Sequence, residues 1–166
     1  MTLRSLPSFC RAILAAGLGL TLASCASTNP AGPGGKIVKV KYYHLNDHST
    51  PIPASDPSVP FERDYHLHGA ITNKEREARE GHYYTVMWKA TDRSQPVKVR
   101  LEYRQQKSGM TDQKQEQDVA QVRRSNQTRF EVTGQEYLDK GPVTSWRATL
   151  VRGKEVLAEA KSYLWD

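Results

Sequence analysis

Residues 96–104 alternate strictly between apolar and charged side chains after the opening proline. The apolar positions are Val97, Val99, Leu101 and Tyr103, and the charged positions are Lys98, Arg100, Glu102 and Arg104. Only a β-strand with one buried face and one wet face makes use of such a period of two. This segment therefore excludes an amphipathic helix here and predicts a sheet with one face on a core.

Several other segments are rich in β-forming residues. We expect further strands at residues 37–45, 65–72, 83–90, 128–133, 144–151 and 155–165. Residues 105–127 are strongly polar and predict an edge strand plus a loop. Residues 73–81 predict one short polar helix with Asn73 as its N-cap. The fold class that follows is all-β: an antiparallel β-sandwich of about seven strands with at most one short helix.

The last two predicted strands surround Arg152-Gly153-Lys154. If these residues form the hairpin loop, Ala148 faces Ala158 and Trp146 faces Ala160. A loop of Gly153-Lys154 alone would pair Ala148 with Glu159 and so mix apolar with charged side chains on one face. We therefore expect the longer loop, with Gly153 in the backbone conformation that other residues avoid.

Two of these strands resemble those of a known class of domain. Val86-Met87-Trp88, followed by the sequence VRLEYR at 99–104, is similar to the tryptophan and tyrosine strands of fibronectin type III and other immunoglobulin-like domains. Tyr137, ahead of Trp146, resembles a tyrosine corner. The resemblance implies an immunoglobulin-like sandwich without the cysteine pair of antibody domains, and no specific family.

The N-terminal segment has the features of an export signal. Arg4 and Arg11 accompany an eleven-residue apolar run at 12–22, which is too short to cross a membrane and fits a secretory signal. The next residues, Leu22-Ala23-Ser24-Cys25, resemble the bacterial lipobox. This resemblance implies cleavage before Cys25, diacylglycerol on its sulfur and acylation of the new amino group. Ala26, rather than Asp, favours the outer membrane.

The expected organisation is a lipoprotein signal peptide at 1–24, a lipidated Cys25 with a flexible tether at 25–35, and a β-sandwich domain at 36–166. The tether contains mainly small residues, Pro and Gly, which bury too little apolar area to order themselves. Two or three acyl chains anchor a protein stably to a membrane. We therefore expect a cell-envelope location, at the outer membrane, with the domain in the periplasm or at the cell surface.

All five histidines lie between residues 44 and 82. On a strand, His66 and His68 would project from one face, a spacing that can chelate Cu or Zn. A periplasmic metal site would combine them with His44, His48 or Asp47. The alternative is that these residues are ordinary polar positions on loops and a wet strand face.

Motifs of catalysis are missing from the sequence. It has no Gly-x-Ser-x-Gly, no Ser-x-x-Lys and no Gly-rich phosphate loop, and export together with the lack of a binding fingerprint argues against nucleic acid. We expect no enzyme activity and no cofactor apart from the lipid on Cys25. The expected function is a non-catalytic accessory or protein-interaction domain that contacts an envelope protein or a cell-wall component through a sheet edge or loops. Metal binding is the alternative function. Four tyrosines also offer a face that could bind protein or glycan: Tyr42, Tyr43, Tyr65 and Tyr83.

Overall fold

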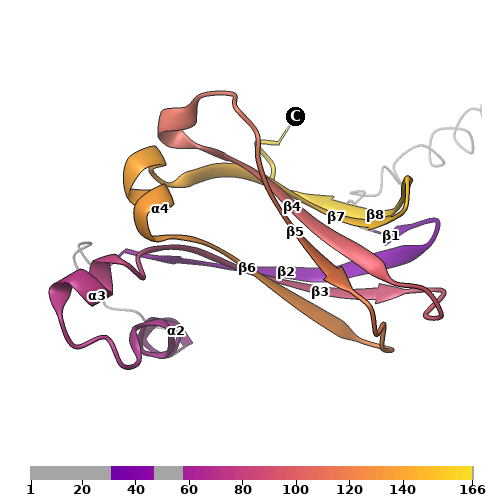
Figure 1. Cartoon of the computed structure of the whole chain (residues 1–166), viewed down its shortest axis with the longest axis horizontal. Coiled ribbons are helices and arrows are strands. Elements are labelled where there is room, and N and C mark those ends of the chain that lie inside the picture. Colours follow the sequence, from indigo (N-terminus) through magenta and orange to yellow (C-terminus); the bar gives the residue numbers. More distant parts are fainter. Residues whose placement is uncertain (1–30, 47–57, 166) are drawn as a thin grey trace, which may run out of the picture.

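The computed structural model describes residues 31–46 and 58–165, and in it two antiparallel sheets of four strands lie face to face (Figure 1). Sheet A has the order β1-β2-β3-β6, and sheet B has the order β5-β4-β7-β8. This arrangement confirms the predicted all-β sandwich. The strands of sheet A are β1 (Ala31–Gly32), β2 (Gly35–Leu45), β3 (Gly81–Ala90) and β6 (Asn126–Thr133). Those of sheet B are β4 (Val97–Gln105), β5 (Gln113–Val119), β7 (Val143–Arg152) and β8 (Glu155–Lys161).

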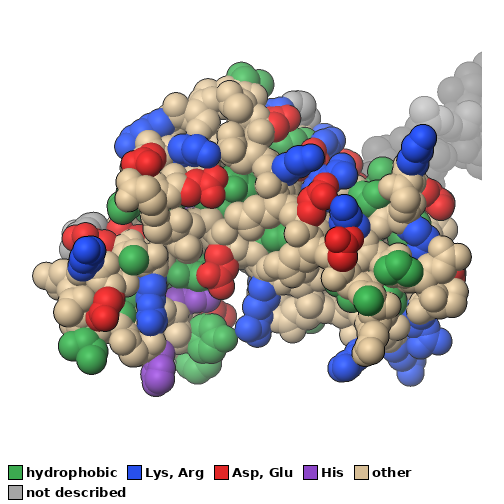
Figure 2. Space-filling view, viewed as in Figure 1, with side chains coloured by type: hydrophobic (Ala, Val, Ile, Leu, Met, Phe, Trp, Pro, Cys, Tyr) green, Lys and Arg blue, Asp and Glu red, His purple; other side chains and the backbone are tan. Residues whose placement is uncertain are grey.

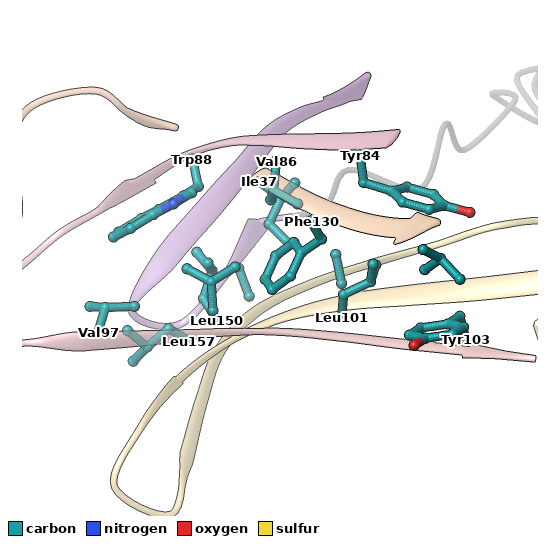
Figure 3. Packing of buried hydrophobic residues seen from close by; sticks show 14 residues of the cluster. Ile37, Tyr84, Val86, Trp88, Val97, Leu101, Tyr103, Phe130, Leu150 and Leu157 are labelled. Atoms are coloured by element: carbon teal, nitrogen blue, oxygen red, sulfur yellow. The ribbon is translucent and has the colours of Figure 1, made fainter. Parts of the chain in front are cut away.

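The core fills the space between the sheets. All four apolar positions of the alternating segment are at most 2% exposed, as predicted, and they face Tyr84, Val86 and Trp88 of β3 (Figure 3). The indole N–H of Trp88 donates to Thr128 Oγ1 at 3.0 Å, which satisfies the polar atom of the largest buried side chain.

The helices correct the sequence analysis. The structure contains α2 (Ser58–Leu67), α3 (Asn73–Glu77), α4 (Gly134–Lys140) and the short 3₁₀ helix η1 (Gln106–Ser108), so the prediction of at most one short helix is wrong. The strand predicted at 65–72 is wrong as well, because residues 65–67 end α2. Pro60 lies in the first turn of this helix, where its missing N–H removes no helical hydrogen bond.

Helix α3 lies within the predicted segment but begins differently. Its N-cap is Thr72 rather than Asn73, in a capping box with Glu75. Thr72 Oγ1 accepts from the Glu75 amide at 3.2 Å, and the Glu75 carboxylate accepts from the Thr72 amide at 2.9 Å. This reciprocal pair satisfies two amides that the first turn leaves free.

The β7–β8 hairpin has the shorter loop that the sequence analysis rejected. Arg152 pairs with Glu155, and Gly153 has a φ of 58°, as expected for a tight turn. The register then shifts at a bulge, so that Leu150 pairs with Ala158 and Ala148 with Ala160. The bulge restores the segregation of apolar from charged side chains that a regular short hairpin would have lost.

The N-terminal boundary also differs from the prediction. Residues 31–35, assigned above to the tether, form β1 and its turn into β2. The amide of Gly34 donates to the carbonyl of Leu157 at 3.3 Å, and a Cβ at Gly32 would lie 2.2 Å from that same oxygen. Glycine therefore allows a close approach of β1 to β8 that links the two sheets.

Candidate functional site

The structure separates the histidines that the sequence grouped. His66 lies in α2 and His68 just after it, so they do not share a strand face as predicted. Adjacent positions on β2 point to opposite faces of sheet A, and His44 faces the interior while its neighbour Tyr43 faces outward. His66 stacks on the outward ring, so His44 and His66 are on opposite sides of the sheet.

Two members of the predicted metal set, Asp47 and His48, lie outside the described residues, as does Cys25. Within residues 31–46 and 58–165, no group of three or more His, Cys, Asp or Glu side chains could hold a metal ion. The described geometry therefore gives the metal hypothesis no support.

His44, which is half-buried, and His82, which is buried, instead stack at one end of the sandwich. Their ring centroids are 4.1 Å apart with the planes 6° from parallel, and His44 Nε2 lies 2.8 Å from the Tyr137 hydroxyl. The Val143 amide donates to His82 Nε2 at 3.0 Å, which places the imidazole proton on Nδ1. Nδ1 has no hydrogen-bond partner among the described residues.

Burial favours the neutral form of both rings. Burial and then the neighbouring His44 lower the pKa of His82 to about 3, and burial also lowers the pKa of His44. The lone pair of His82 is occupied by a backbone amide, so it has no free base to offer a substrate. This cluster joins β2, β3, α4 and β7.

A groove with a volume of about 860 Å³ lies on the outer face of sheet A. Strands β2, β3 and β6 form its floor and helix α2 forms one wall. Figure 2 shows the surface hollowed at the lower centre, between the lobe that carries α2 and α3 and the sheet, with Lys or Arg side chains on the sheet side.

The wall of the groove is aromatic because of helical spacing. Phe61 and Tyr65 are four residues apart, so they share a face of α2 and stack with centroids 6.4 Å apart. They are 66% and 53% exposed, which is unusual for large rings that lie beside each other. His66 turns the other way and packs flat on Tyr83 at 3.7 Å, with Tyr43 at 5.4 Å, so it anchors the helix to the sheet.

The floor of the groove is basic. Lys39 and Lys41 on β2 are exposed, and Arg129 on β6 faces outward beside them. The row continues beyond the groove, where Lys36 pairs with Lys89 across β2 and β3. Among the described residues, none of the four lysines has an ion-pair partner, and Arg129 makes one hydrogen bond, to the Tyr65 hydroxyl at 3.5 Å.

The outer face of sheet B has the opposite character. Its charges neutralise one another in short cross-strand pairs, such as Arg100–Glu116 at 2.7 Å and Arg147–Glu102 at 2.8 Å. Among the described residues, most charges on the outer face of sheet B are thus paired, whereas the lysines on the outer face of sheet A have no ion-pair partner.

Hydrogen bonds join the two sheets along both of their long sides, from β5 to β6 and from the turn after β1 to β8. The Gln115 side chain donates to the Glu131 carbonyl of edge strand β6 at 2.8 Å, and Gln117 donates to the Arg129 carbonyl at 2.5 Å. On the other side, the Gly34–Leu157 bond joins the turn after β1 to β8. These contacts occupy backbone groups that a docking strand would need, so the outer face of sheet A is a better candidate than the sheet edges.

Sequence reasoning identified part of this groove. All four tyrosines offered as a binding face belong to the lining of the groove, although the ring of Tyr42 stacks on His82. It missed Phe61 and the lysine row. The spacing of Phe61 and Tyr65 by four residues was the signal for the first, and the recurrence of lysine along 36–41 was the signal for the second.

In comparisons with known proteins, no family model, no curated protein and no solved structure matches the chain. Among the described residues, no helix is long and apolar enough to cross a membrane.

Proposed function

We propose that the protein is an envelope lipoprotein whose β-sandwich binds another envelope component without catalysing a reaction. Signal cleavage before Cys25 leaves a lipidated N-terminus anchored in the outer membrane. Five residues lie between Cys25 and Ala31, and the six steps from one to the other reach at most about 20–22 Å at about 3.3–3.6 Å per residue. The domain is therefore held close to the membrane, in the periplasm or at the cell surface.

The observation that carries the binding function is the groove on the outer face of sheet A. It combines two exposed stacked rings with unpaired lysines, and a soluble domain gains no stability from either feature. The residues that line it fit binding better than catalysis, because the imidazole of His66 is used in packing on Tyr83.

We propose further that the sandwich is of the immunoglobulin-like kind. In support, β2-β3-β6 and β5-β4-β7-β8 follow the order of strands A, B, E and C′, C, F, G of that fold. Tyr137 lies in the connection between β6 and β7, where a tyrosine corner belongs, although its hydroxyl bonds His44 instead of the backbone.

Photo-crosslinking of the full-length lipoprotein in its own cells tests the binding function. A photoreactive phenylalanine at position 65 lies in the groove, and the same residue at position 163, where Tyr163 is 96% exposed, is the control. We expect an adduct at position 65 and none at 163. Equal labelling at both positions, or labelling at 163 alone, would contradict the proposal.

The anchor has a separate test. The intact mass of the protein extracted from its own membranes should show loss of residues 1–24 and the added mass of diacylglycerol and an acyl chain, whereas Cys25→Ser should carry no lipid and retain residues 1–24. A wild-type protein without added lipid mass would show that the lipoprotein assignment is wrong.

A further inference from the structure

The outer face of sheet A is longer than a small ligand. From Tyr43 to Lys36 the outward residues of β2 extend over seven residues, or about 23 Å at 3.3–3.4 Å per residue. The aromatic wall lies at one end, and cations follow along the rest of the face. A molecule that uses the whole face must itself be extended.

The charge of this face selects an anionic partner. Its cations are Lys36, Lys39, Lys41, Lys89 and Arg129, and the only carboxylate among the outward residues of β2, β3 and β6 is Glu131. Glu62 of α2 is the second acid that lines the groove, and it lies 3.7 Å from His66. Because these lysines have no ion-pair partner in the described part of the chain, an anionic group can bind them without breaking an existing pair there.

The backbone geometry argues against a peptide in this position. A bound strand is held mainly by main-chain hydrogen bonds at a sheet edge, whereas the floor of the groove is a sheet face and presents side chains only. At the edge strand β6, the carbonyls of Arg129 and Glu131 already accept from glutamine side chains of β5. Acidic polypeptide therefore lacks the contacts that would give it specificity.

The shape argues against a membrane surface. Lys39 and Lys41 line a hollow that helix α2 walls at one end, so a flat lipid surface would meet the exposed rings of α2 before it reached these lysines. A polymer chain can lie along the hollow instead.

We propose that this face binds an anionic glycan chain, with a sugar ring on Phe61 and Tyr65 and carboxylate groups on Lys39, Lys41 and Arg129. Sugar rings carry a face of C–H groups that packs on aromatic rings, and their carboxylates form charge-assisted hydrogen bonds with ammonium and guanidinium groups. This inference rests on the proposed binding function and names its ligand class.

Titration calorimetry of the chain from residue 26 onward, which retains the whole described core, gives the test. The probes are alginate as a polyuronate, dextran as a neutral glycan, poly-glutamate as an acidic polypeptide, and vesicles of phosphatidylglycerol and phosphatidylcholine. We expect binding to alginate that weakens as salt is added, and no binding to dextran, since the cations supply the attraction.

Two pairs of variants separate the two halves of the site. Lys39→Ala/Lys41→Ala should weaken alginate binding by about tenfold or more, whereas Lys114→Ala/Lys154→Ala, with the same loss of charge elsewhere on the surface, should change it less than about twofold. Phe61→Ala/Tyr65→Ala should also weaken it by about tenfold, since stacked rings contribute that much to such contacts. Circular dichroism and the unfolding midpoint establish that each variant is folded.

Four results would overturn the proposal: no alginate binding, equal binding of poly-glutamate, binding of vesicles in preference to alginate, or alginate binding that the aromatic pair does not affect. A crosslink at position 65 in cells combined with no alginate binding would show that the binding function holds and the ligand class is wrong. Absence of that crosslink would instead count against the binding function itself.

Discussion

Acid should destabilise this domain through His82. The side chain is 1% exposed, and burial followed by the neighbouring His44 imidazole lowers its pKa from 6.5 to about 3. The unfolded chain takes up a proton near the ordinary pKa of about 6.5, so below that value it binds more protons than the folded chain. The stability contributed by neutral His82 is therefore complete above pH 6.5 and is lost as the pH falls towards 3.

The size of the effect follows from those two pKa values. At pH 5, His82 is almost completely protonated in the unfolded chain and almost completely neutral in the folded chain. This difference lowers the free energy of unfolding by about 2 kcal/mol relative to pH 8. Burial also lowers the pKa of His44 and of His66, and these shifts act in the same direction.

Urea unfolding followed by tryptophan fluorescence at pH 7 and pH 5 measures this loss. His82→Gln can still accept from the Val143 amide but does not titrate, so its stability should change by clearly less between the two pH values. His68→Gln, a substitution on the exposed side chain beyond α2, is the matched control and should keep the wild-type pH dependence. Equal stability of the wild type at both pH values, or an unchanged dependence in His82→Gln, would show that His82 does not cause the loss of stability in acid.

Three further predictions concern stability and local order. Thr128→Val should cost about 1–3 kcal/mol of unfolding free energy in urea melts, because it leaves the buried indole N–H of Trp88 without its acceptor; an unchanged midpoint would contradict this. Gly32→Ala should cost roughly 1–3 kcal/mol in the same assay, since its Cβ would overlap the Leu157 carbonyl, and a neutral result would show that β1 can move away freely. His66→Ala should speed amide hydrogen exchange in α2 while the strands keep their protection, and uniform protection would mean that the imidazole does not anchor this helix.

The sandwich could be predicted because its strands carry their own periodicity. The alternation at 97–103 identifies buried and wet faces without any knowledge of neighbouring strands, and all its inward positions are buried. The hairpin loop could not be derived in the same way. A bulge opposite Leu150 shifts the register by one residue, and nothing local in the sequence indicates where a sheet accepts such an extra residue.

The candidate site depends on contacts that no local pattern contains. His66 and His68 look like a pair on a strand, but packing of α2 on sheet A turns His66 onto Tyr83 and separates it from His44. Tyrosines 43, 65 and 83 come together only because α2 returns to the outer face of β2 and β3. The sequence also could not show that the lysines of sheet A lack ion-pair partners among the described residues. This became clear only when the structure placed carboxylates such as Glu102 and Glu116 on sheet B, where they pair with arginines.

Mapping of amide chemical shifts is the most direct test that the outer face of sheet A is the binding surface. The ¹⁵N-labelled chain from residue 26 onward would be titrated with short alginate oligosaccharides. The account predicts shifts at residues 36–43, 83–89 and 127–131 and in the aromatic turn of α2. Shifts on β4, β5, β7 and β8 instead, or no shifts at saturating ligand, would contradict it.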